Sequence, residues 1–240
     1  MFDMRRIRQD FSAAAPHYDT QTPLQKHVLS QLLAKALPMM PAHAHILDAG
    51  CGTGRLVRQC PGHHVTQLDG AYAMCVKAAA PEAPAVTGAI ESLPFKDEVF
   101  DSVCCSLVLQ WVPDTKLAMK EMQRVLKRGG VLAVSTFGPG TLKELKESFA
   151  AADDYPHVST FAAQPGFDRR EIVTEYYPDL FSLMSHLKTI GARNKLLERR
   201  KSMMTRGQMQ KVEQRYKERF AMPSGLPVSW EILYSVIRKP

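Results

Sequence analysis

A short glycine-rich segment that follows an apolar run limits what this chain can fold into more than any other feature. Residues 46–54 read Ile-Leu-Asp-Ala-Gly-Cys-Gly-Thr-Gly, which is typical of a buried strand that enters a tight turn and opens a helix. Glycine in such a turn allows a positive φ and leaves main-chain atoms open to a bound molecule. The segment therefore predicts a strand–turn–helix unit with a small molecule lying on the turn.

The turn differs from the usual dinucleotide pattern. Counted from Gly50, the third glycine of GxGxxG would fall at position 55, which is Arg55. Bulk there hinders the helix packing and pyrophosphate approach that NAD binding requires. Asp48 would repel a pyrophosphate but can orient an ammonium group, directly or through water. The pattern favours a ligand that has an amino-acid end and no phosphates.

The second apolar run supplies a candidate ribose-binding group. It ends at Asp69 and Gly70, and Asp69 lies nineteen residues after Gly50. The first two strands of a doubly wound sheet are neighbours, so this carboxylate can accept hydrogen bonds from both ribose hydroxyls. Alone, Asp69 would be read equally well as an ordinary turn residue. Combined with the glycine turn, it predicts a ribose site.

Apolar runs alternate with helix-like segments such as 117–127 through the first two thirds of the chain. The runs lie at 44–49, 63–69, 84–88, 100–109 and 130–137. Strands that alternate with helices predict a parallel sheet wrapped on both faces. The remaining elements that we expect are helical stretches at 5–37 with a break at Pro16, at 141–151 with Thr141 as cap, at 179–190 and at 205–220, and strands at 172–177 and 228–237.

We expect a single domain without a metal site. Residues 1–41 would place helices over the site, 42–140 would bind the cofactor, and 141–240 would add cap helices and the last strands. The five cysteines are odd in number and lack CxxC spacing, which favours reduced, inert thiols. The histidines near 43–45 and 63–64 fall at strand starts, away from the site.

The composition and the N-terminus favour a cytoplasmic protein. No run of about eighteen apolar residues is present to span a bilayer. Basic residues near the N-terminus are not followed by the apolar stretch of a secretory signal. We therefore expect a cytoplasmic monomer with no membrane partner.

Several of these motifs together resemble the class I S-adenosylmethionine-dependent methyltransferases. They are residues 48–54, Asp69, 90–95 and 100–103. The resemblance implies an α/β, doubly wound, seven-stranded and mostly parallel sheet whose last strand is antiparallel, with S-adenosylmethionine across the carboxyl ends of strands one, two and four. The cofactor-binding residues that it implies are Tyr18, Asp48, Gly50, Cys51, Gly52, Asp69, Gly70, Ala89, Ile90, Ser106 and Leu107.

Two of these residues have a second interpretation, and one departs from the family pattern. Tyr18 could instead cap the core, and Cys51 is a small filler rather than a nucleophile. Members of the class often carry Asp, which receives the adenine amino group, where this chain has Ala89. Loss of one charge-assisted hydrogen bond weakens binding by roughly 1.5 to 3 kcal/mol unless water or the Ile90 backbone replaces it.

A narrower resemblance covers nearly the whole chain. Residues 11–19, 24–25, 109–111, 136–145, 157–158 with Phe161, and 187–192 are similar to those of the biotin-pathway malonyl-[acyl-carrier protein] O-methyltransferases. The resemblance implies methylation of the free carboxylate of a malonyl thioester on acyl carrier protein. Ser106 departs from the Asn that is usual in this family, and the stretch before Ile172 is short for the helix that normally precedes strand six.

The implied chemistry requires no general base. A carboxylate acceptor with a pKa of about 4 is already ionised at neutral pH. In-line methyl transfer to it therefore depends on alignment of the reacting groups and on removal of water. We therefore expect no catalytic acid or base. The substrate-binding candidates are Gln110, Trp111, Lys188 and Arg193, although Trp111 can equally be a packing residue and Lys188 can simply be solvated.

Positive charge is concentrated in one segment, residues 188–219. It holds eleven Lys or Arg against three Glu, an excess of eight, while the whole chain carries +7. An acidic acyl carrier protein would be steered toward such a surface. A plain solvated helix is the alternative. The segment has few aromatic residues on which bases could stack: it contains Tyr216, and Phe220 follows directly after it. We therefore expect no nucleic-acid partner.

Two other functions remain open from the sequence. The chain could methylate another small carboxylic acid or a quinone precursor. It could also be a methyltransferase-fold protein that has lost turnover and serves as a binding partner, a hypothesis that Ala89 and Ser106 keep open.

Overall fold

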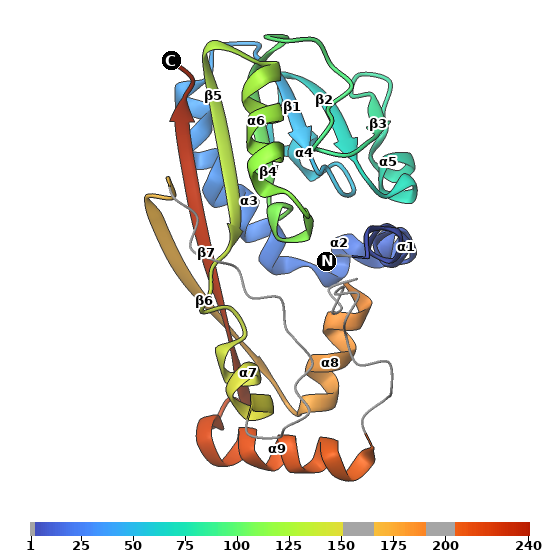
Figure 1. Ribbon diagram of the computed structural model, residues 1–240, viewed down its shortest axis with the longest axis vertical. Helices are drawn as coiled ribbons and strands as arrows, with labels where there is room; N and C mark the ends of the chain where they lie inside the picture. Colours follow the sequence, from blue (N-terminus) through green and yellow to red (C-terminus); the bar gives the residue numbers. More distant parts are fainter. Residues whose placement is uncertain (1–2, 151–165, 191–204) are drawn as a thin grey trace.

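The computed structural model describes residues 3–150, 166–190 and 205–240, which contain a seven-stranded sheet (Figure 1). The strand order is β3-β2-β1-β4-β5-β7-β6. β1 pairs in parallel with β2 and β4, β4 pairs in parallel with β5, and β2 pairs in parallel with β3. β7 runs antiparallel to both β5 and β6. The expected doubly wound, mostly parallel sheet with an antiparallel last strand is therefore confirmed.

The strands lie where the apolar runs predicted them, with some changes of boundary. They are β1 (His45–Ala49), β2 (His64–Asp69), β3 (Ala85–Thr87), β4 (Phe100–Ser106), β5 (Leu126–Phe137), β6 (Arg169–Tyr177) and β7 (Leu226–Arg238). β5 starts earlier than expected, so the helix that was expected at 117–127 ends at Val125. The run expected at 100–109 leaves the sheet after Ser106 and continues into the 3-10 turn η3 (Leu109–Trp111).

The helices agree with the predicted segments except at one cap. They are α1 (Met4–Ala14), α2 (Tyr18–Gln21), α3 (Pro23–Ala36), α4 (Arg55–Gln59), α5 (Tyr72–Ala78), α6 (Thr115–Val125), α7 (Lys143–Ala150), α8 (Leu180–Thr189) and α9 (Arg206–Phe220), with 3-10 turns η1 (Ala15–His17) and η2 (Leu37–Met39). The prediction that Thr141 caps a helix is wrong. Its hydroxyl donates to the Glu231 backbone oxygen at 3.0 Å, and α7 begins two residues later.

The central strands present alternate side chains to two hydrophobic layers. Ile46 packs in one buried cluster with Val28 and Leu32 of α3, whereas Leu47 packs in the other with Met122 of α6. Successive side chains of a strand point to opposite faces, so neighbouring residues must enter different cores. α3 and α6 accordingly cover opposite faces of the sheet (Figure 1).

The amino ends of the first strands are tied together by histidines. His43 Nδ1 lies 2.9 Å from the Gly62 oxygen, and the Ala44 amide donates to His63 Nδ1 at 3.1 Å. In the part of the chain that the structure describes, no three His, Cys, Asp or Glu side chains are grouped to hold a metal ion. The histidines at the strand starts therefore have structural partners in the loops.

The helices of the last third of the chain gather at one end of the molecule. α7 contacts α9, α9 contacts β7, and α8 rises from that end toward α2 (Figure 1). Asp179 and Thr205 cap α8 and α9, since each side chain accepts a backbone hydrogen bond from the first turn. None of the helices in the described ranges is long and apolar enough to cross a membrane.

Candidate functional site

A cavity lies between the carboxyl ends of β1, β2 and β4 and the helices α1 and α2 (Figure 1). All eleven residues that the sequence predicts to bind a cofactor line this cavity, and so does Trp111. The carboxyl edge is where doubly wound sheets bind ligands, because the strand-to-helix turns meet there. The structure therefore brings the predicted residues together, although they come from positions 18 to 111 of the chain.

The glycine turn is shaped by close contacts that exclude side chains. Gly50 has a φ of 90°, and a Cβ built on it would lie 2.2 Å from Cγ2 of Val108. Its amide donates to the Leu68 oxygen at 2.7 Å, and the Cys51 amide donates to the same oxygen at 2.9 Å. Gly52 has a φ of 54°. The turn thus forms a side-chain-free floor that is fixed to the end of β2.

Asp69 joins the end of β2 to this floor. Its Oδ2 accepts from the Gly52 amide at 3.0 Å and its Oδ1 accepts from the Ala71 amide at 2.8 Å. Burial raises the pKa of Asp69, and the backbone hydrogen bonds oppose that effect. Two carboxylate oxygens offer about four acceptor positions, so acceptor capacity remains for hydroxyl groups of a ligand.

Asp48 is a buried carboxylate beside the turn, with 5% of its surface exposed. Burial, with the negative charge of Asp69 adding to it, raises the pKa of Asp48 to about 7. An isolated buried carboxylate is unfavourable until an opposite charge approaches. The site therefore favours a cationic ligand group next to the glycine turn.

The end of β4 forms another wall, and its backbone is strained. Leu107 lines the cavity with a φ of 54°, which is unusual for a residue other than glycine. Its amide donates to the Ser135 oxygen at 2.9 Å, and its own oxygen accepts from Gln110 Nε2 at 2.6 Å. Gln110 is buried and does not line the cavity, so the structure places it as a support of Leu107.

Ala89 and Ile90 line the cavity beyond Asp69, where the loop after β3 turns. The Gly88 amide donates to the Asp69 oxygen at 3.0 Å, which holds this loop against β2. The Ala89 side chain offers no hydrogen-bond acceptor to a ligand. Glu91, two residues later, also lines the cavity and carries an acidic side chain.

Helix α1 contributes a wall that the sequence prediction of site residues missed. Met4, Ile7 and Phe11 line the cavity from one stripe of the helix, and Arg8 lines it beside them. Phe11 meets Trp111 edge to face with ring centroids 5.4 Å apart. The spacing of Met4, Ile7 and Phe11 is the i, i+3, i+7 pattern of a buried helix face and could have revealed the wall.

The structure places neither of the two basic substrate candidates at the cavity. Lys188 is exposed near the end of α8 and does not line the cavity, and Arg193 lies outside the described residues.

Cys51 lines the cavity as a buried thiol, and its hydrogen bond with Cys75, together with burial, raises its pKa. A thiol with a raised pKa is a poor nucleophile at neutral pH, which agrees with a filling role.

The strand order, the glycine turn after β1 and the carboxylate after β2 define a Rossmann-like methyltransferase of class I. Residues 47–134 match the family model described as a methyltransferase domain. The crystal structure of the YcgJ protein from Bacillus subtilis has the same fold, with a TM-score of 0.61, 17% identity, and coverage of 90% of this chain and 99% of that chain.

Curated relatives narrow this class to one family. A protein of Dechloromonas aromatica named malonyl-[acyl-carrier protein] O-methyltransferase is 36% identical, over 98% of this chain and 94% of the relative. The biotin biosynthesis bifunctional protein BioHC of Teredinibacter turnerae is 35% identical, over 98% of this chain and 47% of that longer protein. The chain therefore belongs to the malonyl-[acyl-carrier protein] O-methyltransferase family and is an O-methyltransferase.

Proposed function

We propose that this protein transfers a methyl group from S-adenosylmethionine to the free carboxylate of a malonyl thioester on acyl carrier protein, in the synthesis of a biotin precursor. The observation that carries the proposal is the cavity in which a side-chain-free turn, a buried carboxylate and an aromatic wall meet. The name of the Dechloromonas aromatica relative suggests the acceptor, and the name of the Teredinibacter turnerae relative suggests the biotin pathway.

The residues of the cavity fit S-adenosylmethionine group by group. Asp48, whose raised pKa favours a nearby cation, suits the ammonium of the methionine moiety, and the floor at Gly50 and Gly52 admits its backbone. Asp69 suits the ribose hydroxyls. The cofactor set we propose is completed by Tyr18, Cys51, Gly70, Ala89, Ile90, Ser106 and Leu107.

The chemistry assigned to the protein is binding and alignment. When bound, S-adenosylmethionine supplies an electrophilic methyl group on a positively charged sulfur. The acceptor carboxylate is ionised at neutral pH, so no residue has to remove a proton from it. Phe11 and Trp111 contact each other edge to face and form an apolar part of the cavity wall, a surface that disfavours bound water. Holding two reacting groups about 3 Å apart can contribute roughly 7 to 11 kcal/mol.

The carrier protein is proposed to approach near the carboxyl end of α8. Helix α8, whose last residues begin the basic segment 188–219, contacts α2, whereas α9 lies at the opposite end of the molecule from β1, β2 and β3 (Figure 1). On α9, Lys217 pairs with Glu213 at 2.6 Å and Arg219 pairs with Glu147 at 2.8 Å. Lys188 is thus better placed than the cations of α9 to meet an acidic partner at the site.

The test is methyl transfer to matched carrier proteins. Purified protein, S-adenosylmethionine labelled in the methyl group, and malonyl-loaded carrier protein should give a labelled, base-labile ester, whereas acetyl-loaded carrier protein should stay unlabelled. Asp69→Ala should abolish the labelling. Equal labelling of both carriers, or labelling of a quinol in place of the malonyl group, would contradict the proposed acceptor.

A further inference from the structure

The chain segment 15–22, which we call the strap, carries Tyr18 to the cavity without much structure of its own. It consists of the 3-10 turn η1, the single turn α2, and Thr22. One helical turn is not stable by itself, because nucleation fixes several residues for one hydrogen bond. The conformation of the strap must therefore come from contacts with other elements.

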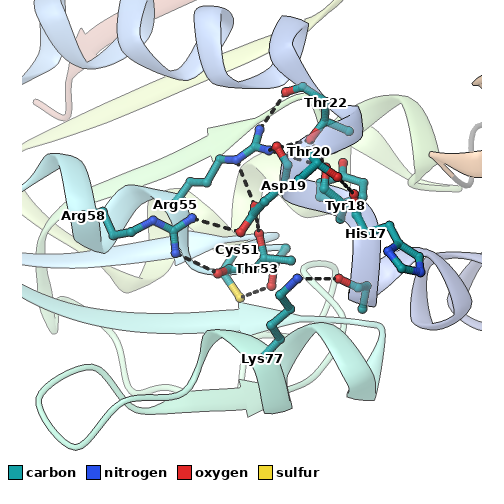
Figure 2. A network of polar contacts seen from close by, with 12 residues as sticks. His17, Tyr18, Asp19, Thr20, Thr22, Cys51, Thr53, Arg55, Arg58 and Lys77 are labelled. Atoms are coloured by element: carbon teal, nitrogen blue, oxygen red, sulfur yellow. Dashed lines mark hydrogen bonds and ion pairs between the residues drawn. The ribbon is translucent and has the colours of Figure 1, made fainter.

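Arg55, the first residue of α4, donates more hydrogen bonds to the strap than any other residue in the described part of the chain (Figure 2). Its Nε donates to Asp19 Oδ1 at 3.1 Å, and its Nη1 donates to the Thr22 oxygen at 2.8 Å. Its Nη2 donates to the Asp19 oxygen at 2.9 Å and to Thr22 Oγ1 at 2.6 Å. The last carbonyls of a helix lack partners within the helix, and a cation is favoured there. Arg55 thus acts as the C-terminal cap of α2.

Asp19 fixes this cap from the other side. Burial opposes its ionisation, but the hydrogen bond from Thr53 Oγ1, at 2.5 Å, and the nearby cations outweigh burial and lower the pKa of Asp19. The Arg55 side chain is only 12% exposed, and Asp19 is 34% exposed. A guanidinium that is buried and paired in this way has few donors left for a substrate, although Arg55 lines the cavity.

Arg55 also bears on Tyr18 itself. Its guanidinium carbon lies 5.9 Å from the centre of the Tyr18 ring. A Cβ built on Gly52 would lie 3.8 Å from Cε1 of that ring, so Tyr18 stands over the floor of the cavity. Burial raises the pKa of Tyr18 to about 12. The hydroxyl is therefore a neutral group at physiological pH, and its position follows from the strap.

We propose that Arg55 is a positioning residue that holds the strap and thereby keeps Tyr18 over the cofactor cavity. The inference rests on the proposed function in that the cavity binds S-adenosylmethionine. Arg55 acts through the strap and not through contact with the reacting groups. Its role is distinct from that of Arg58, one turn later, which is 57% exposed and reaches Asp19 only at 3.4 Å.

The test is a double-mutant cycle on cofactor affinity, measured by calorimetry with S-adenosylmethionine. Arg55→Ala and Tyr18→Ala should each weaken binding about tenfold. Both variants remove the contact between Tyr18 and the cofactor, the first by displacing the side chain and the second by deleting it. The double variant should bind no more weakly than about twofold below either single variant, since coupled residues are not additive. Arg55→Lys should give an intermediate loss, and the control Arg58→Ala should change affinity less than about twofold.

Amide hydrogen exchange of the cofactor-free protein provides a readout that does not depend on the proposed function. Arg55→Ala should increase exchange at 15–22 and leave the α3 amides unchanged. Losses in affinity that multiply to about a hundredfold in the double variant, or unchanged exchange in the strap, would overturn the proposal. Failure of the wild-type protein to bind S-adenosylmethionine would overturn the proposed function instead, and exchange would still decide on Arg55.

Discussion

The two sides of the cofactor cavity are held in different ways. The glycine turn is fixed by its own backbone, with positive φ at Gly50 and Gly52 and amides bound to the end of β2. The strap opposite is fixed by cations from elsewhere, Arg55 on α4 and Lys77 on α5 (Figure 2). Substitutions in the turn should therefore abolish cofactor binding, whereas substitutions in the strap should only weaken it.

The largest effect should come from Gly50→Ala. The new Cβ would collide with Val108 and must accept a φ of 90°, so we expect a loss of about 2 to 5 kcal/mol in the free energy of unfolding. Thermal unfolding should show it, and calorimetry should show no S-adenosylmethionine binding. Gly62→Ala is a matched control, with a φ of 82° and open space for the Cβ. Equal losses in both variants would mean that the Val108 contact is unimportant.

The pH dependence of cofactor affinity should report on Asp48. Its pKa of about 7 in the free protein means that the carboxylate must lose a proton before it can pair with an ammonium group. Affinity should fall toward tenfold per unit below pH 7, and it should also fall at the alkaline end once the ligand's α-amino group, with a pKa of about 8, loses its proton. Calorimetry from pH 5.5 to about 8.5 measures this slope, and Asp48→Asn should remove it. A slope that survives in Asp48→Asn would assign it to another group.

The same shift makes a prediction for stability. The pKa of Asp48 in the folded state lies above the ordinary value of 3.8 for an aspartate, so the folded state binds more protons than the unfolded state between the two values. The stability contributed by protonated Asp48 is full at low pH and is lost as the pH rises through about 7. In cofactor-free protein at pH 8, Asp48→Asn should therefore raise the unfolding temperature, and a lower temperature would contradict the assignment.

On the side of the cavity that the strand ends form, Ala89→Asp should increase the affinity for S-adenosylmethionine. The new carboxylate would stand at the cavity wall where the adenine end is proposed to bind, and one charge-assisted hydrogen bond should tighten binding about tenfold. Titration calorimetry with S-adenosylmethionine measures the change. Ala221→Asp makes the same charge change at an exposed position after α9 and should leave affinity unaltered. Unchanged affinity in Ala89→Asp would place the adenine amino group elsewhere.

The smallest effect should follow Lys77→Met on the strap side. Lys77 Nζ donates to the Ala15 oxygen at 2.8 Å and to the Pro16 oxygen at 3.1 Å, so it caps the beginning of the strap. Loss of these partly exposed bonds should weaken S-adenosylmethionine binding about threefold and speed amide exchange at 15–17. Lys116→Met, at an exposed position of α6, serves as the control. A loss larger than that of Arg55→Ala would make Lys77 the main anchor.

The sequence predicted the backbone geometry of the glycine turn because the information for it is local. Gly50, Gly52 and Asp69 carry a backbone geometry and a strand end that are legible in about twenty-five neighbouring residues. The partners of the strap are 33 to 62 residues away along the chain, as in the Thr22–Arg55 and Ala15–Lys77 contacts, and no periodicity encodes them. Thr141 failed as a cap for the same reason, because its partner lies on β7.

The placement of β7 has a consequence for biosynthesis. β6 is made before β7, yet within the described residues all of its strand pairing is with β7. On the ribosome, residues 169–177 therefore wait as an unpaired edge until 226–238 have emerged, and an open edge can pair with a second nascent chain. The interval between the two strands sets how long this edge stays open on each newly made chain.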